Sequence, residues 1–154
     1  MNDIEFGSSL YRLYHSVVKL EDAAVGDNKN CTGLTVNELN LIDCVHRLSK
    51  GSEGPSISAI ANELEITRPS TTVAVNKLVS KEIVTKSECE KDGRSVRVKL
   101  TPKGEKAYST HHTFQNNLTK EARKQFSEEE YKNIVNAVCA LSKFFDEKIE
   151  NLDD

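Results

Sequence analysis

Six side chains able to contact nucleic acid lie between residues 68 and 77, where the pattern predicts the start of a helix. They are Arg68, Ser70, Thr71, Thr72, Asn76 and Lys77. In the major groove, arginine suits guanine, asparagine suits adenine, and hydroxyls suit base edges or phosphates. Helix-start hydrogen bonding alone could explain the three hydroxyls, but neighbouring hydroxyls exceed what a cap needs. The cluster therefore predicts a DNA-reading helix.

The preceding residues predict a helix and a tight turn that would position this cluster. Ser56 or Ser58 can cap the helix, and Ile66 is expected to be the apolar plug of the turn that follows. Thr67 is the expected N-cap of the reading helix, and Pro69 is tolerated in its first turn. The apolar residues predict which sides face the core: Ile57, Ile60, Ala61 and Leu64 in the first helix, and Val73, Ala74, Val75, Leu78 and Val79 in the second. The helix-turn-helix is expected at about residues 56–80.

A basic β-hairpin is predicted directly after the reading helix. Ile83 and Val84 open one strand, and residues 96–100 alternate between apolar and basic in the other. Asp92-Gly93 is typical of the tight turn between two strands. A helix-turn-helix followed by such a wing, here at about residues 83–100, is a design for binding DNA.

Four of the cations in the wing have different expected roles. Arg94 is predicted to probe the minor groove, where negative potential is concentrated, and Lys91 is expected to contact DNA beside it. Arg97 and Lys99 are expected to contact phosphates or to form a solvated strand face.

Long helices are predicted on both sides of this module. Thr35 with Glu38 and Ser127 with Glu130 form capping boxes, and Thr101-Pro102 is expected to begin a helix that runs to about residue 122. Apolar stripes over residues 4–25 and along the last helix are too extensive for the central module to cover. We expect them to bury each other in a homodimer, with pairing inside one chain as the alternative.

Composition agrees with one mainly α domain of six helices. The net charge is −3, yet residues 56–104 carry 9 Lys/Arg against 6 Asp/Glu, while both flanks are acidic. This asymmetry points to an anionic partner at one face. No stretch looks like a signal peptide or a membrane span, so a cytoplasmic protein is expected, and the four scattered cysteines are expected to be reduced.

Catalysis is not expected. The sequence contains no GxSxG, GxxxxGK[ST] or HExxH motif, and no catalytic residue, resident metal or cofactor is predicted. The remaining rival class is a winged helix that docks proteins. Such a module should lack a polar, basic first turn on its second helix, and this chain has one.

The residues of this module resemble the MarR family of bacterial transcription regulators. The resemblance rests on four stretches: Leu34-Thr35 with Glu38, Ile60-Ala61 with Leu64, Leu78-Val79, and Lys91 to Val98 followed by Leu100-Thr101-Pro102-Lys103-Gly104. The Asp-x-Arg of the wing followed by Leu-Thr-x-x-Gly is fairly specific. Two departures are Glu65 and Glu82, which stand where glycine is common, so each joint is expected to be strained or reshaped.

The resemblance implies a MarR-like homodimer that binds a pseudo-palindromic operator, with repression as the family expectation. Asp92 would then hold the wing or orient an arginine, although turn geometry alone also explains it. A single domain is expected over residues 1–154, with the winged-helix module at 31–104 and dimerisation helices at 1–30 and 105–154.

The resemblance also implies a small effector that binds between the DNA module and the terminal helices. Candidate lining residues, each of which could equally be ordinary core, are Leu10, Tyr14, Val17, Leu41, Val45, His111 and Phe114. The stretch Val73-Ala74-Val75-Asn76-Lys77-Leu78 is similar to the fatty-acid-synthesis repressor branch. That similarity implies an acyl-chain ligand, for which acyl carrier protein is a candidate carrier.

Oxidation and metal binding remain alternative triggers. Peroxide-sensing relatives use a first-helix cysteine, which this chain lacks, but Cys31 is expected in an exposed loop and Cys89 near the wing. Cys44 and Cys139 are expected to be core residues. Residue types that could bind a metal are Cys31, Glu38, His46, His111 and His112, although the zinc-sensing branch has more histidines.

Overall fold

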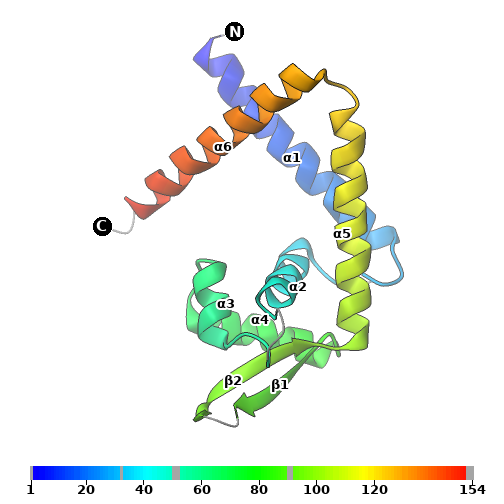
Figure 1. Cartoon of the computed structure of the whole chain (residues 1–154), viewed down its shortest axis with the longest axis vertical. Coiled ribbons are helices and arrows are strands. Elements are labelled where there is room, and N and C mark those ends of the chain that lie inside the picture. The colour runs from blue at the N-terminus through cyan, green and yellow to red at the C-terminus, as the bar shows by residue number, and fades with distance from the viewer. Residues whose placement is uncertain (1, 32, 50–52, 90–91, 152–154) are drawn as a thin grey trace. The chain divides into compact units, whose positions relative to one another are not determined.

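The computed structural model describes residues 2–31, 33–49, 53–89 and 92–151; the side chains of residues 27, 89, 92–95 and 150 are outside this description. Two compact units divide the chain, Met1–Phe114 and Gln115–Asp154. In the described part there are six helices and two strands (Figure 1): α1 Asp3–Asp27, α2 Val36–Leu48, α3 Ile57–Glu63, α4 Arg68–Ser80, β1 Val84–Cys89, β2 Asp92–Leu100, α5 Pro102–Arg123 and α6 Glu128–Glu150. The prediction of a mainly α fold with six helices and a small wing is confirmed.

Side-chain caps begin the helices where the sequence predicts them. The hydroxyl oxygen of Thr35 accepts from the Glu38 backbone N–H, and the Glu38 carboxylate accepts in return from the Thr35 N–H, at 3.3 and 2.9 Å. The same reciprocal pair joins Ser127 and Glu130 at the start of α6. Ser56, not Ser58, caps α3. Each cap satisfies backbone donors that the first helical turn leaves unpaired, which stabilises a helix by about 1 kcal/mol.

The core of the first unit lies where α2, α3, α4 and the wing strands meet. Its fully buried side chains come from each of these elements, as expected for a module built around one centre; they include Leu39, Ile42, Val45, Ile60, Val75, Leu78, Val84 and Val98. Burying an aliphatic side chain of this size contributes about 1.5–3 kcal/mol. The core therefore fixes α4 against α2 and β1, leaving one face of α4 in solvent.

The wing is an antiparallel hairpin whose register runs from Val84 opposite Leu100 to Glu88 opposite Val96. After an irregularity at Glu88/Cys89, Cys89 pairs with Asp92. Asp92 and Gly93 therefore begin β2, and the prediction that they form the turn is wrong. The connecting residues 90–91 are outside the described part. The strand pairing, which a two-residue sequence signal does not reveal, decides where the turn falls.

The segment before α3, residues 54–56, pairs with strand β2 along its backbone. Val98 N–H donates to the Pro55 carbonyl at 3.0 Å, and Ser56 forms a bridge with Arg97. Gly54 has a φ of 89°, and a Cβ there would lie 2.2 Å from the Val98 carbonyl oxygen. Only glycine fits this close approach, so Gly54 fixes the base of the wing to the start of the helix-turn-helix.

Three apolar residues predicted to be internal are exposed. Ile66 in the turn is 41% exposed, and on α4 Val73 is 56% and Val79 36% exposed. At 3.6 residues per turn, Val73 lies about 200° around the helix from Val75, so the two cannot both face the core. Val79 lies on the same side as Val75 but near the C-terminal end of α4, where it is partly uncovered. Thr71 takes the inner position instead, fully buried, with its hydroxyl donating to the Thr67 carbonyl at 3.0 Å.

Glu65 and Glu82 have left-handed backbones, with φ of 52° and 60°. They are the only non-glycine residues with positive φ in the described part of the chain. Glu65 stands in the turn before α4 and Glu82 directly after α4. The expectation that these two departures from glycine would strain a joint is confirmed, because left-handed backbone is costly for residues with a Cβ.

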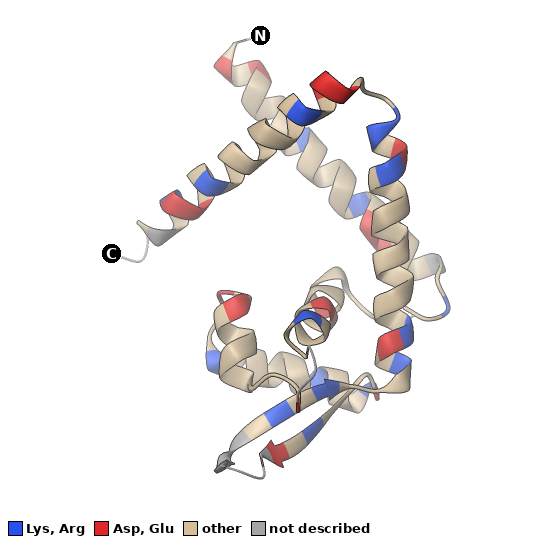
Figure 2. Cartoon of the chain, viewed as in Figure 1, with Lys and Arg blue, Asp and Glu red and all other residues tan. Residues whose placement is uncertain are grey.

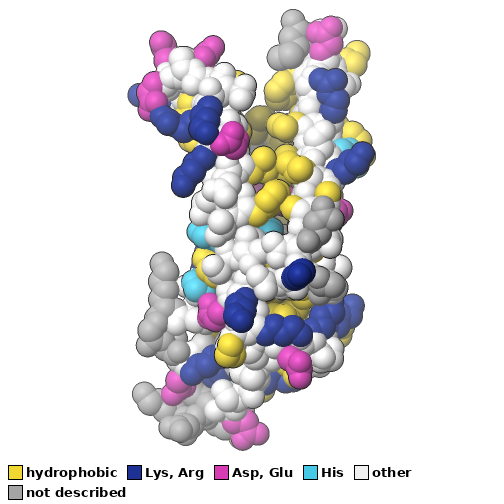
Figure 3. All heavy atoms as spheres, turned by 90° about the vertical axis from the view of Figure 1, so that its right-hand side faces the viewer, with side chains coloured by type: hydrophobic (Ala, Val, Ile, Leu, Met, Phe, Trp, Pro, Cys, Tyr) yellow, Lys and Arg dark blue, Asp and Glu magenta, His cyan; other side chains and the backbone are white. Residues whose placement is uncertain are grey.

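Each unit also exposes a helix with an apolar stripe. In the first unit, Tyr11, Leu13, Tyr14 and Val17 of α1 are at least 41% exposed. Figure 3 shows hydrophobic side chains exposed on the face it displays, with basic side chains scattered over the same face. In the second unit, α6 exposes Ile134, Val135, Val138, Phe144, Phe145 and Ile149. None of the helices, as far as the structure describes them, is apolar enough over enough length to cross a membrane.

Candidate nucleic-acid interface

The start of α4 is held by Thr67 and Pro69. Thr67 Oγ1 accepts from the Ser70 backbone N–H at 3.2 Å and donates to Ser70 Oγ at 2.9 Å. Pro69 lies in the first turn, where its missing N–H leaves no helix bond unmade. The Ser70 hydroxyl accepts the Thr67 proton, so its own proton is available for a phosphate or a base. This helix start is therefore formed locally and faces solvent.

The buried residues of α4 define which side can meet a ligand. Thr71, Val75 and Leu78 face the core. The helical period puts Val73, Asn76 and the residues around them on the opposite, exposed side. Of the six predicted DNA contacts on α4, five are exposed: Arg68, Ser70, Thr72, Asn76 and Lys77.

Two of the three neighbouring hydroxyls make helix bonds. Thr71 is fully buried, so the prediction that it contacts DNA is wrong for this structure; its hydroxyl and its methyl complete the core. Thr72 is exposed, but its hydroxyl donates to the Arg68 carbonyl at 2.9 Å. Hydrogen bonds within the first turns of α4 therefore use the hydroxyl protons of Thr71 and Thr72. Of the three neighbouring hydroxyls, only that of Ser70 keeps its proton for DNA.

Val73 was missed by the sequence reasoning. Its apolar side chain and its place in the run Val73-Ala74-Val75 predict a core residue. In the structure it is exposed by more than half, on the same side of α4 as Asn76. An exposed β-branched methyl pair on a reading helix can contact the methyl group of thymine. Strict use of the helical period, with Thr71 and Val75 as inner residues, could have found it.

Lys86 was also missed, because it lies on β1 rather than in the helix or the wing tip. Its Nζ donates to Asn76 Oδ1 at 2.7 Å, and both side chains are exposed. An ammonium group has donors only, so it selects the oxygen end of the amide. The contact orients the one amide on the outer face of α4.

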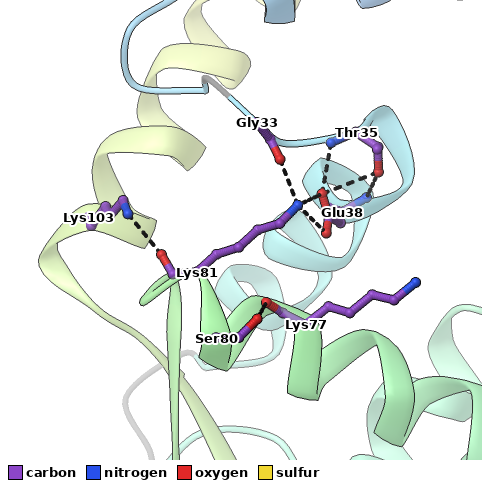
Figure 4. Close-up of polar contacts among 7 residues, drawn as sticks. All are labelled: Gly33, Thr35, Glu38, Lys77, Ser80, Lys81 and Lys103. Carbon is purple, nitrogen blue, oxygen red and sulfur yellow. Dashed lines mark hydrogen bonds and ion pairs between the residues drawn. The ribbon is translucent and has the colours of Figure 1, made fainter.

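A lysine at the C-terminal end of α4 connects it to the start of α2 (Figure 4). Lys81 Nζ lies 2.7 Å from both Glu38 carboxylate oxygens and 2.6 Å from the Gly33 carbonyl oxygen. Burial alone would raise the pKa of Glu38, but the hydrogen bonds from Lys81 and Thr35 outweigh it and hold that pKa below its usual value. Lys103 Nζ donates in turn to the Lys81 carbonyl at 2.8 Å. We call Lys81, Glu38 and Gly33 the α2–α4 latch.

The side chain of Lys77 points in a different direction from that of Lys81. In Figure 4 its side chain extends away from the latch, and it is exposed. A free lysine on this side of α4 is suited to a phosphate. The two lysines thus have separate roles, one towards the protein and one towards solvent.

The wing adds positive charge beside α4, as the basic segments of β1 and β2 show in Figure 2. Lys99 is exposed, whereas Arg97 is partly buried and its Nη1 donates to the Gly54 carbonyl at 3.3 Å. Arg97 thus fastens the base of the wing. Lys91 and the side chains of Asp92 and Arg94 are outside the described part, so their predicted roles stay predictions.

The predicted effector residues do not line one cavity in the described part of the chain. Tyr14 and Val17 line a hollow of about 510 Å³ between α1 and α2. Leu41 lines another of about 540 Å³ between α2 and α4, which Val73 and Lys77 also border. His111 and Phe114 border a cavity of about 40 Å³. Val45 is buried in the core, and Leu10 is half-buried on α1.

Two cysteine predictions are wrong. Cys31 is 2% exposed rather than exposed in a loop, and its Sγ lies 3.8 Å from the Ala107 carbonyl oxygen, because the chain after α1 folds onto α5. Burial raises the pKa of the Cys31 thiol, which makes it less reactive. Cys139 is exposed rather than part of the core of its own unit. Cys44 is buried as expected, with burial raising its pKa to about 11.

Three histidines, His46, His111 and His112, lie on or against α5. The His46 ring stacks on Tyr108 at 3.7 Å between centroids, and His46 Nδ1 lies 3.2 Å from Glu105 Oε2. His111 is 7% exposed, and burial lowers its pKa. No group of three or more metal-binding side chains comes together among the residues that the structure describes.

Comparison with known proteins agrees with this geometry. Residues 34–96 match the model of the MarR family. Among curated proteins, no sequence matches the chain. Solved structures do match. The fold resembles that of Streptococcus pneumoniae FabT in complex with DNA, with a TM-score of 0.86 and 21% sequence identity, and the match covers 95% of this chain and 99% of FabT. Two structures of S. aureus MepR, each 20% identical in sequence, also match. The complex with DNA has a TM-score of 0.71 and covers 88% of this chain and 96% of MepR. The complex with ethidium bromide has a TM-score of 0.62 and covers 89% of this chain and 95% of MepR.

The capped helix pair, its solvent-facing second helix and the basic hairpin define a winged helix-turn-helix protein. Residues 34–96 of this module carry the match to the MarR family, which supports a DNA-binding transcription regulator.

Proposed function

We propose that this protein binds a pseudo-palindromic DNA operator as a homodimer and represses transcription under the control of a small ligand. The observation that carries the proposal is the outer face of α4. It presents cationic, hydroxyl, amide and apolar side chains together, which is the range needed to contact phosphates, base edges and thymine methyls. The exposed members are Arg68, Ser70, Val73, Asn76 and Lys77. FabT and MepR, which share the fold, have been solved with DNA.

The terminal helices support dimerisation. Apolar stripes on α1 and α6 are exposed in the single chain, and patches of this kind mark interaction surfaces. A two-fold dimer would place the two α4 helices on half-sites about one turn of DNA apart, which explains the expectation of a palindrome. The module at 31–104 would read DNA, and residues 1–30 and 105–154 would join the two copies.

Repression is the simplest consequence of such binding, because a dimer on an operator that overlaps a promoter excludes polymerase. A small effector would act by changing the spacing of the reading helices. An apolar or acyl-chain molecule suits the hollows beside α2, which predicted residues Tyr14, Val17 and Leu41 border. MepR, a structural neighbour, has been solved with ethidium bromide.

The test is selection of duplexes from a randomised library, followed by affinity titration on the selected site at several salt concentrations. Phosphate contacts release counterions, so affinity should fall steeply with salt. Lys77→Ala should weaken binding to all sequences about equally and reduce the salt slope by about one. If the wild-type protein enriches no duplex at low salt, the proposal is wrong.

A further inference from the structure

The contact between Lys86 and Asn76 joins the wing strand to the reading helix at the point where a base would be read. Asn76 is on the exposed side of α4, and Lys86 comes from β1, the strand that packs beside that helix. Their Nζ–Oδ1 distance of 2.7 Å is that of a charge-assisted hydrogen bond. The bond leaves the Nδ2 hydrogens of Asn76 available.

An asparagine that pairs with adenine uses both ends of its amide. The nitrogen donates to adenine N7, and the oxygen accepts from the adenine N6 amino group. The Lys86 ammonium takes one of the two acceptor positions of the Asn76 oxygen and places a positive charge beside the other. That charge repels the N6 amino hydrogens and attracts base acceptors, of which guanine presents two, O6 and N7, in the major groove.

We propose that Lys86 is a specificity-determining residue: by holding the Asn76 oxygen, it makes Asn76 read guanine through donation instead of adenine through a two-sided pair. The inference rests on the proposed DNA-binding function and adds the base preference at one position of each half-site. Lys86 acts here as a positioning residue, because its effect on the base passes through the Asn76 amide.

The expected base preference differs from that of a lysine that only contacts phosphate. A phosphate contact strengthens binding to every sequence equally. The Lys86–Asn76 pair instead predicts that one position depends on both residues together. Lys99 offers a matched control, since it is an exposed lysine on the neighbouring strand β2.

The experiment is library selection with the full chain, comparing wild type, Lys86→Met, Asn76→Ala, the double variant and Lys99→Met, with melting temperatures to confirm folding. Wild type should select guanine at one position per half-site, and Lys86→Met should shift that position to adenine, changing the ratio of the two affinities about tenfold. Asn76→Ala should remove the preference, and the double variant should match Asn76→Ala. Lys86→Arg, which keeps a cationic donor, should keep guanine.

Two results would overturn the inference in distinguishable ways. If Lys86→Met weakens binding evenly and leaves the selected sequence unchanged, as expected for Lys99→Met, then Lys86 contacts phosphate only and the specificity role is wrong. If wild type selects no duplex, the DNA-binding proposal fails and this inference fails with it.

Discussion

Glu65 and Glu82 stand at the two ends of the reading helix with a backbone conformation that suits glycine. A left-handed residue with a Cβ costs about 1–2 kcal/mol, whereas glycine adopts it freely. Glu65 lies in the turn that sets the start of α4, and Glu82 lies where the chain leaves α4 for the wing. The strain is therefore placed at the two joints that orient this helix.

Replacing either glutamate with glycine should stabilise the protein. Glu65→Gly and Glu82→Gly are each expected to raise the free energy of unfolding by about 0.5–1 kcal/mol, since relief of strain exceeds the added entropy of the unfolded chain. Urea unfolding measures the change. Glu65→Ala and Glu82→Ala remove the charge and keep the Cβ, so they should give no gain. Equal gains from alanine would mean that charge, and not backbone strain, matters here.

Val73 lies on the exposed side of α4, where it can contact a base without supporting the core. Val73→Ala should leave stability within about 0.5 kcal/mol, because the side chain is largely exposed and surface changes are usually small. It should lower affinity for a site with thymine at the contacted position about fivefold or more, with less effect where uracil, which lacks the methyl, replaces that thymine. Anisotropy titrations on the two duplexes measure the difference.

The neighbouring Val75 is the control for Val73. It is fully buried, so Val75→Ala should cost about 1–3 kcal/mol of stability through lost packing. If Val73→Ala proved the more destabilising of the two, the assignment of the α4 faces would be reversed.

At the scale of elements, the α2–α4 latch connects the reading helix to the helix beneath it. Lys81→Met or Glu38→Gln should each lower stability by about 1–2 kcal/mol, and the double-mutant cycle should show a coupling of about 1 kcal/mol. Both variants should also weaken specific DNA binding more than non-specific binding, because α4 would lose one of its supports. Purely additive stability losses would mean that the two side chains do not act as a pair.

The latch has a defined pH dependence. The pKa of Glu38 is held below its value of 4.5 in the unfolded chain. The Glu38 carboxylate therefore contributes fully to the free energy of unfolding above pH 4.5. This contribution should be lost as the pH falls through the lower folded-state pKa. Glu38→Gln should therefore flatten the acid side of the stability–pH curve, measured by thermal unfolding between about pH 3 and 7. A curve identical to that of wild type would rule out this contribution.

The elements were largely predictable from the sequence, because caps and periodicity act locally. Thr35, Thr67 and Ser127 each begin a helix where the pattern indicates. The errors arise where tertiary structure decides. Strand pairing moves Asp92 into β2, and the chain after α1 buries Cys31 against α5. The Lys86–Asn76 contact could not be found by spacing along the sequence, because it joins two different elements.

Binding to a two-fold symmetric operator requires two copies of the chain. Val138→Glu on α6 and Leu13→Glu on α1 place a charge on stripes that are 54% and 60% exposed at these residues in the single chain. Each should convert the dimer to monomer at micromolar concentration, because a buried, unpaired charge is costly in an interface. Sedimentation velocity measures this, and affinity for a two-half-site operator should fall with it.

Asn136→Glu is the matched control, because residue 136 lies on the opposite side of α6 from Val138 by the helical period. It should leave both the dimer and DNA binding intact. If Val138→Glu and Leu13→Glu also sediment as wild type does, the apolar stripes are not the dimer interface.

The decisive experiment for DNA binding by α4 is selection from a randomised duplex library by the purified full chain, followed by sequencing and by titration of the selected site against salt. We expect a two-fold symmetric site with half-sites about 10 base pairs apart, bound with an affinity that falls steeply as salt rises. When Asn76 is replaced by alanine, the base preference at the position that Asn76 contacts should be lost. An unenriched library, or a selected site that is indifferent to every exposed side chain of α4, would contradict the account.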